Sequence, residues 1–399
     1  MPFFFATSID SACPTDSRGA RIDQMDRSGH YARWEEDFEL VRSLGVSVLR
    51  YGPAYYRTHV GPDHFDWDVV EEPMQKLQAL GVTVVAELCR FGVPSWLGGF
   101  QDPAFPVLFA EYARAFARRY PWIRHFTPVS EIYLCARMSA LEGEWNEREK
   151  SDATFVRAVR NLCMAHELAV EGILSERPDA VIIQSESLEY MHAAGRGAGT
   201  AADRWNMLRF LPLDLTLGHE LAPGVGSLLN EHGMTSNDLS FFRERRAAPR
   251  QLGLVYHHES ERRLSSSGRI TAAHDGLGFG RLAADYFKRY RLPLVHYGAH
   301  HPIRGGAAWL NHQWEDVLSL RAAGTPVHGF TWSSLVDHVS VQPSDRDRAG
   351  ERCYVEPVGL YSVSRRPSQL ADEFSSLVSR WGPVMSGLEA GAESHAAEG

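Results

Sequence analysis

Strand-like and helix-like segments alternate along almost the whole chain, and this alternation constrains the fold more than any other feature of the sequence. Short apolar runs are followed by longer stretches that contain helical periodicity or turn residues. Eight such repeats predict parallel strands joined by helices in a single (β/α)8 barrel of the α/β class, rather than an open doubly wound sheet. The expected strands are Phe3–Thr7, Ser47–Tyr51, Val82–Cys89, Ile123–Val129, Ala180–Ser185, Leu252–His257, Leu292–Tyr297 and Val327–Trp332.

The expected helices carry their apolar residues on one face, and we expect Pro73 to interrupt the second of them near its start. No stretch of the sequence predicts a second hydrophobic core. We therefore expect one barrel over residues 1–385 and a flexible tail over 386–399, which is rich in small and acidic residues. The expected helices are Tyr31–Leu44, Trp67–Leu80, Ala104–Arg119, Thr154–Ser175, Phe279–Arg289, Ala307–Ala323 and Ser368–Trp381.

Several classes of partner are disfavoured by the composition. No GxGxxG or Walker motif follows a strand, so we expect no nucleotide cofactor. The formal net charge of −9 and the lack of a basic stripe argue against nucleic acid, and no apolar run is long enough to span a membrane. Five cysteines without a CxxC pair predict reduced thiols and a cytoplasmic protein. A small-molecule substrate remains as the expected partner, and the oligomeric state is not indicated.

Titratable and aromatic residues are concentrated at the expected carboxyl ends of the strands, where barrel enzymes carry their active sites. Any one of them could be an ion-pair partner or a loop cap, but the whole set predicts a functional pocket. The candidates in chain order are Asp10, Arg50, Tyr51, Arg90, Ser130, Glu131, Glu186, Tyr256, His257, Tyr297, Gly298, His300 and Trp332.

Five segments at these strand ends carry motifs in the order of one known family. The motif-bearing segments are Leu49–Tyr51, Phe91–Leu97, Thr127–Glu131, Leu252–Tyr256 and Phe330–Asp337. They resemble the Tyr-Arg-Phe, Pro-x-Trp-Leu, Thr-x-Asn-Glu-Pro, Leu-Gly-Ile-Asn-Tyr-Tyr and Trp-Ser-Leu-Leu-Asp motifs of the family 1 glycoside hydrolases, the β-glucosidase family. The resemblance implies a barrel in which Glu131 is the acid/base catalyst. It also implies a cis peptide bond between Trp332 and Ser333.

The departures from the family pattern bear on the mechanism. Where the family has its nucleophilic glutamate, this chain has Gly298. The other replacements affect residues that hold the sugar: Ser130 and Val255 stand for asparagines, Arg90 for a histidine, and Ser340 and Val341 for a Glu-Trp pair. A retaining glycosidase needs two carboxylates about 5–5.5 Å apart, so Glu131 alone does not suffice. An engineered substitution could explain Gly298, but the coordinated departures favour a natural change of function.

We therefore predict an enzyme that acts on a sugar-containing or sugar-like small molecule, with Glu131 as general acid/base. Space at Gly298 could admit a water for an inverting attack, with Glu186 or Glu259 as the base. A non-hydrolytic isomerisation or cyclisation in a biosynthetic pathway would need only acid/base groups. Arg50, Glu131, Glu186, Tyr256 and Trp332 are expected to line one cavity.

Two alternatives remain open. The side chains of His257, His300 and Glu186 form a workable metal-ligand set, although no ligand spacing fixes them. The chain could also be a catalytically inactive binding protein that keeps the pocket. Arg90, which replaces a neutral ring, predicts an anionic or strongly hydrogen-bonding group on the substrate unless it is paired within the protein.

Overall fold

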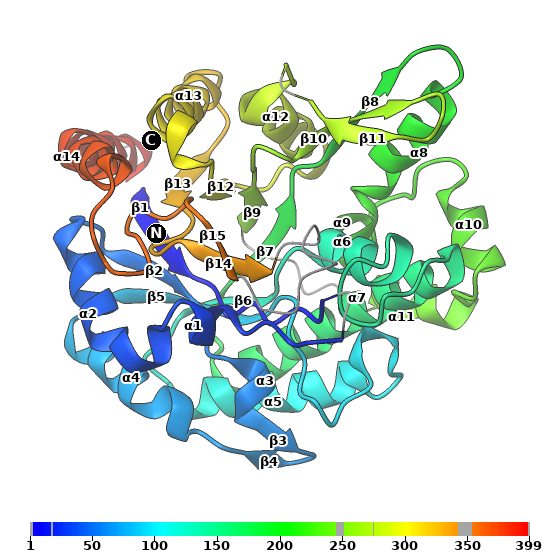
Figure 1. Cartoon of the computed structure of the whole chain (residues 1–399), viewed down its shortest axis with the longest axis horizontal. Coiled ribbons are helices and arrows are strands. Elements are labelled where there is room, and N and C mark those ends of the chain that lie inside the picture. Colours follow the sequence, from blue (N-terminus) through cyan, green and yellow to red (C-terminus); the bar gives the residue numbers. More distant parts are fainter. Residues whose placement is uncertain (1–2, 17–18, 245–250, 274, 342–352, 398–399) are drawn as a thin grey trace.

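The computed structural model describes residues 3–16, 19–244, 251–273, 275–341 and 353–397. Eight parallel strands close into a barrel, in the order β1-β13-β12-β9-β7-β6-β5-β2, with β1 pairing to both β13 and β2 (Figure 1). Each barrel strand overlaps one of the expected strands, so the predicted (β/α)8 barrel is confirmed. The strands are β1 (Phe4–Ile9), β2 (Val48–Tyr51), β5 (Thr83–Cys89), β6 (His125–Val129), β7 (Val181–Ser187), β9 (Gln251–Val255), β12 (Leu294–Ala299) and β13 (Val327–Trp332).

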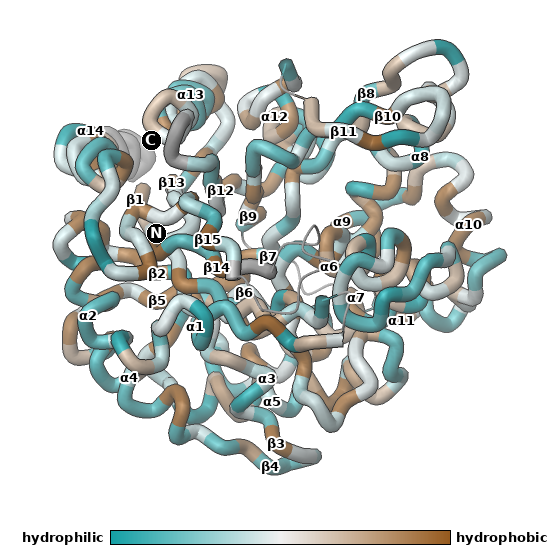
Figure 2. The backbone as a smooth tube through the Cα atoms, viewed as in Figure 1, coloured by the Kyte–Doolittle hydropathy of each residue, from teal (hydrophilic) through white to brown (hydrophobic). Residues whose placement is uncertain are grey.

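Helices surround the barrel, and each of the seven expected helices is present. Figure 2 shows hydrophilic and hydrophobic residues alternating along them, as expected for helices that bury one face. Pro73 lies inside one continuous helix, so the expected interruption is wrong. The outer helices are α2 (His30–Ser43), α4 (Asp68–Ala79), α5 (Phe105–Arg119), α7 (Asp152–Glu176), α12 (Gly278–Tyr290), α13 (Ile303–Ala322) and α14 (Gln369–Ala397). Because α14 extends to Ala397, it includes most of the expected tail, and the division of the chain near residue 386 stays a prediction.

The inside of the barrel is filled by its own cluster of side chains. Valines, Ile183, Ala6 and the rings of Phe4 and Tyr297 form this inner core, and they come from β1, β2, β5, β7, β9 and β12. The Tyr297 hydroxyl lies 2.5 Å from Thr127 Oγ1, and the Arg50 guanidinium lies over the Tyr297 ring at 3.9 Å. A Cβ atom at Gly253 would lie 2.7 Å from the Tyr297 ring, so this glycine leaves room for the ring in the inner core. The site above therefore has a packed floor.

Segments inserted after the strands cover the carboxyl end of the barrel. A three-stranded sheet is formed by β8 (Tyr190–Ala194), β10 (Glu261–Ser265) and β11 (Ile270–Ala272), and β14 (His338–Val341) pairs with β15 (Cys353–Glu356). After β6 the chain continues through α6 (Ile132–Ala136) into the π-helical turn η2 (Arg137–Leu141). These insertions supply much of the wall of the candidate site.

Two further findings concern the chain as a whole. Among the residues described here, no helix has the length and apolar character needed to cross a membrane. Four cysteines, Cys13, Cys89, Cys135 and Cys163, are buried free thiols. Reduced thiols agree with the expectation from the sequence, and the compartment itself stays a prediction.

Candidate functional site

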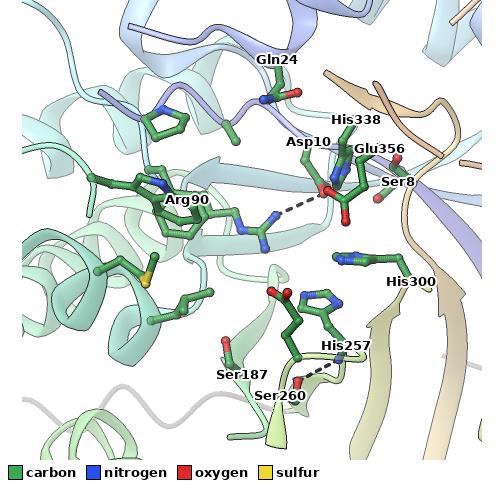
Figure 3. A pocket seen from close by; sticks show the side chains of 18 of the residues that line it. Ser8, Asp10, Gln24, Arg90, Ser187, His257, Ser260, His300, His338 and Glu356 are labelled. Carbon is green, nitrogen blue, oxygen red and sulfur yellow. Dashed lines mark hydrogen bonds and ion pairs between the residues drawn. The ribbon is translucent and has the colours of Figure 1, made fainter. Parts of the chain in front are cut away.

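A cavity of about 520 Å³ opens at the carboxyl end of the barrel. Its wall combines loops that follow the barrel strands with η2, the inserted sheet and the β14–β15 hairpin. Figure 3 shows polar side chains from these different elements converging on one space. The polar lining includes Ser8, Asp10, Arg90, Ser187, His257, His300, His338 and Glu356.

Only some of the predicted site residues reach this cavity. Asp10, Arg90, His257 and His300 line it. The expectation that Arg50, Glu131, Glu186, Tyr256 and Trp332 line one cavity is wrong, because none of the five contributes to the described wall. Tyr51, Ser130, Tyr297 and Gly298 also lie outside the lining.

Glu131 lies directly behind the cavity wall. It follows β6 with φ 52° and ψ 53°, a left-handed conformation that residues other than glycine seldom adopt, and its side chain is fully buried. Its Oε1 accepts a hydrogen bond of 2.6 Å from Ser187 Oγ, and its Oε2 is ion-paired with Arg90 Nη2. Burial raises the pKa of Glu131, although the charge of Arg90 opposes the shift. Ser187 and Arg90 both line the cavity, so they separate Glu131 from it.

Arg90 is paired on both of its terminal nitrogens. Besides Glu131, it contacts Asp10 Oδ2 through Nη1 at 3.2 Å. Asp10 also lies 3.6 Å from Arg50 Nη2, which in turn contacts Glu87 Oε2 at 2.6 Å. Burial opposes ionisation of Asp10, but the charges of Arg50 and Arg90 outweigh it and hold the Asp10 pKa below its usual value. Because Arg90 is paired within the protein, the ground for predicting an anionic group on the substrate is removed.

The space beside Gly298 is occupied. A Cβ atom at this position would lie 2.7 Å from Ser333 Oγ and 3.1 Å from Arg50 Nη1. Ser333 Oγ accepts a hydrogen bond from Arg50 Nη1, so the two groups fill the gap together. A side chain at Gly298 would therefore meet these two groups, and because Gly298 also lies outside the cavity lining, the structure does not support the expected space for a water there.

Glu186 is turned away from the cavity. Its Oε2 accepts a hydrogen bond of 3.1 Å from the backbone N–H of Tyr133 in α6, and its side chain is fully buried. Burial raises the pKa of Glu186 well above its usual value. Because the Glu186 side chain does not reach the cavity, it cannot activate a water there as expected. The other suggested base, Glu259, lines the cavity and is largely exposed.

Four more of the predicted site residues are engaged within the protein. The Tyr256 hydroxyl donates to Glu261 Oε1 at 2.7 Å, and Trp332 Nε1 donates to the Val358 carbonyl at 3.2 Å. The other two polar contacts are Tyr51 Oη to His30 Nε2 at 3.2 Å and Ser130 Oγ to Ser185 Oγ at 2.7 Å. The cis peptide bond lies between Ser333 and Ser334, so its expected position between Trp332 and Ser333 is wrong.

Histidine rings form one side of the cavity. His257 and His300 stack with ring centroids 3.8 Å apart, and His338 approaches His300 edge-on at 5.5 Å. Burial lowers the pKa of His257 and of His300 well below the usual value, which favours neutral rings. Among the described residues, no group of three or more His, Cys, Asp or Glu side chains is arranged to hold a metal ion. The metal hypothesis for His257, His300 and Glu186 is therefore not supported.

A network of four charged side chains was not predicted. Arg137 in η2 contacts Glu142 and, at 2.9 Å, Glu189 Oε1. Arg262 in β10 contacts the same two acids, each at 3.2 Å. All four line the cavity and join the inserted sheet to η2.

Sequence reasoning also missed Ser187 and His338. Ser187 is the last residue of β7 and lies two residues after Ser185. Because side chains alternate between the two faces of a strand, the sequence could have placed Ser187 on the same face of the strand as Ser185. His338 follows directly on Asp337, the last residue of a recognised motif. Both positions, at a strand end and next to a motif, could therefore have been recognised from the sequence alone.

Comparisons with known proteins agree with this fold. No family model matches the chain. In sequence, the chain is 26% identical to a β-glucosidase of Agrobacterium sp. over 153 residues, which are 36% of this chain and 33% of that protein. It is 25% identical to β-glucosidase A of Thermotoga maritima over 155 residues, 36% of this chain and 34% of that protein. These sequence matches span about a third of the relatives' length.

The match in structure is more extensive. A solved β-glucosidase from Thermotoga maritima, in complex with azafagomine, has a TM-score of 0.79 and 16% identity, and the match covers 95% of this chain and 98% of that chain. Another solved structure of the enzyme, in complex with deoxynojirimycin, has the same TM-score and identity over 94% of this chain and 97% of that chain. The chain thus has a glycosidase-like barrel and is similar in sequence to β-glucosidases.

Proposed function

We propose that the protein is an enzyme that acts on a sugar-containing or sugar-like small molecule by acid/base chemistry, with Glu131 as the proton donor and acceptor. The mechanism does not use the covalent nucleophile of a retaining glycosidase. The solved β-glucosidases of this fold bind the sugar mimics azafagomine and deoxynojirimycin, which supports a sugar-like ligand for the cavity.

The surroundings of Gly298 carry this proposal. A retaining mechanism needs a second carboxylate about 5–5.5 Å from the acid/base group. The resemblance to the family places Gly298 at the position of that carboxylate, and Ser333 Oγ and Arg50 Nη1 occupy the space that a side chain at Gly298 would enter. A mechanism limited to proton transfer is consistent with that arrangement.

The environment of Glu131 supports its role. A buried carboxyl group with a raised pKa holds its proton closer to neutral pH and can donate it to an oxygen of the substrate. After donation, the carboxylate would be stabilised by Arg90 at Oε2.

The first prediction concerns simple glycosides. We expect no hydrolysis of nitrophenyl β-glucoside, galactoside or fucoside at high enzyme concentration, because the covalent intermediate of the retaining route cannot form. Release of nitrophenol is the measurement. Robust release that disappears in Glu131→Gln would contradict the proposal and restore an ordinary glycosidase.

The positive test uses a panel of glycosylated and sugar-like compounds, with conversion followed by mass spectrometry. For any converted compound, Glu131→Gln is expected to lower turnover by about 10²–10⁴-fold, the usual contribution of a general acid/base. The matched control is Glu147→Gln, because Glu147 is another carboxyl group whose pKa is raised by burial, and it lies outside the cavity lining. The control is expected to retain its turnover.

A second candidate is ligand binding without turnover. The observation that favours it is the ion pair of Glu131 with Arg90, which closes off one carboxylate oxygen. If the protein only binds its ligand, compounds that raise its Tm would be recovered chemically unchanged. Glu131→Gln would then alter affinity alone.

A further inference from the structure

Ser187 connects Glu131 to the cavity. Glu131 is fully buried and does not line the cavity, whereas Ser187 does. The Ser187 hydroxyl lies 2.6 Å from Glu131 Oε1, within hydrogen-bonding distance. Figure 3 shows Ser187 and Arg90 on the wall of the same pocket. Any proton that passes between Glu131 and a molecule in the cavity must cross this wall.

Arg90 cannot carry that proton. It contacts the other carboxylate oxygen, Oε2, but a guanidinium stays protonated at all ordinary pH values and cannot accept another proton. A serine hydroxyl has one proton to donate and lone pairs to accept one, so it can do both in the same step. Within the part of the chain that the structure describes, Ser187 is hydrogen-bonded and Arg90 is ion-paired to the Glu131 carboxyl group, and both side chains line the cavity.

We propose that Ser187 is a proton-relay residue that carries the proton between Glu131 Oε1 and the molecule bound in the cavity. The relay rests on the proposed function, because it gives the route by which Glu131 acts as the acid. The O–H bond of the Glu131 carboxyl group breaks as its proton passes to Ser187 Oγ. The original O–H bond of Ser187 breaks as that proton passes to an oxygen or nitrogen of the ligand. Ser187 ends as a neutral hydroxyl, and Glu131 ends as a carboxylate beside Arg90.

The relay can be tested without knowing the substrate, because cavity water must reach Glu131 by the same route. The carboxyl C=O stretch of Glu131 is identified by infrared spectroscopy as the band that is lost in Glu131→Gln. The protein is kept at a pH where this band is present and is then mixed rapidly with D₂O. The rate at which the band shifts measures the exchange of the Glu131 proton.

Three variants make the test specific. Ser187→Thr keeps the hydroxyl, and Ser187→Val has a similar shape but lacks it, so neither leaves a gap that water could fill. We expect exchange in Ser187→Val to be at least about 10²-fold slower than in Ser187→Thr, in keeping with the contribution of a positioned proton-transfer group. Ser139→Ala removes a buried hydroxyl outside the cavity lining and is expected to exchange at the wild-type rate.

The outcomes separate the relay from the proposed function. Equal exchange rates in the Thr and Val variants, with the band present, overturn the relay and leave Glu131 as an acid that acts directly. If Glu131→Gln removes no carboxyl band at any pH at which the protein is folded, Glu131 never holds a proton. In that case the acid role fails and the relay fails with it.

Discussion

Gly298 is important both for the proposed mechanism and for the packing around Arg50 and Ser333. Replacing it by alanine places a Cβ atom 2.7 Å from Ser333 Oγ and 3.1 Å from the ion-paired Arg50. We expect Gly298→Ala to lower the free energy of unfolding by about 1–3 kcal/mol, the usual cost of overpacking, measured by urea denaturation. The control is Gly226→Ala in the short helix α10 (Val225–Glu231), where nothing lies within 4 Å of the added atom. Unchanged stability in Gly298→Ala would show that the neighbours move aside freely.

Glu186 gives the stability of the protein a dependence on pH. Because burial raises its pKa in the folded state, the folded protein binds its proton more tightly than the unfolded chain does. The resulting stabilisation is fully present below the unfolded pKa and is lost as pH rises through the folded pKa. Glu186→Gln removes this loss, so the Tm of the variant minus that of the wild type is expected to increase with pH. The exposed Glu149 provides the control substitution Glu149→Gln, which removes a carboxyl group without touching the buried one.

At the scale of elements, ion pairs connect the inserted sheet to η2. They form the network of Arg137, Glu142, Glu189 and Arg262. Arg137 is 5% exposed and contacts both acids, so its removal takes away one of the two guanidiniums of the network and leaves Arg262 as the partner of both acids. We expect Arg137→Ala to lower the free energy of unfolding by about 1.5–3 kcal/mol, the usual contribution of a hydrogen bond to a charged group. Arg118→Ala breaks an ion pair with Glu176 on the surface, where the Arg118 side chain is 62% exposed, and a much smaller loss of stability is expected there. Urea denaturation of both variants checks the contrast.

The barrel elements were predictable because each has a strong period. A strand such as β5 is buried along six of its seven residues and is mostly apolar, with Glu87 as its one charged residue, and α5 repeats its apolar residues at helical spacing. The inserted sheet was missed because its strands carry no such pattern. In β11 all three residues are exposed, so pairing with β10 determines its conformation.

The candidate site was only partly predictable for a related reason. Position at a strand end could be deduced for Asp10, Arg90 and Glu131, and all three lie close together as ion-pair partners. Which of them reaches the cavity depends on side chains from other strands. Arg90 and Ser187 cover Glu131, and no local pattern in the sequence specifies that contact.

At the scale of the whole molecule, one hydrophobic cluster contains residues from Phe3 to Met385. Because this cluster joins strands and helices from both ends of the chain, we expect the barrel to unfold in a single cooperative transition. The measurement is urea unfolding followed by far-ultraviolet circular dichroism and by tryptophan fluorescence, which are expected to give the same midpoint. Two separated midpoints would indicate that the inserted segments form an independent unit.

The row of charges across four neighbouring strands has a consequence for evolution. Acids and guanidiniums alternate along it, in the order Glu87, Arg50, Asp10, Arg90 and Glu131, over the ends of β1, β2, β5 and β6. Loss of Arg50 or of Arg90 leaves the acid at that end of the row, Glu87 or Glu131, without its counter-charge in the row. We therefore expect these positions to change together among descendants of this lineage, so that a homologue without Arg90 also lacks one of its two acids. Pairwise covariation among homologous sequences would record that linkage directly.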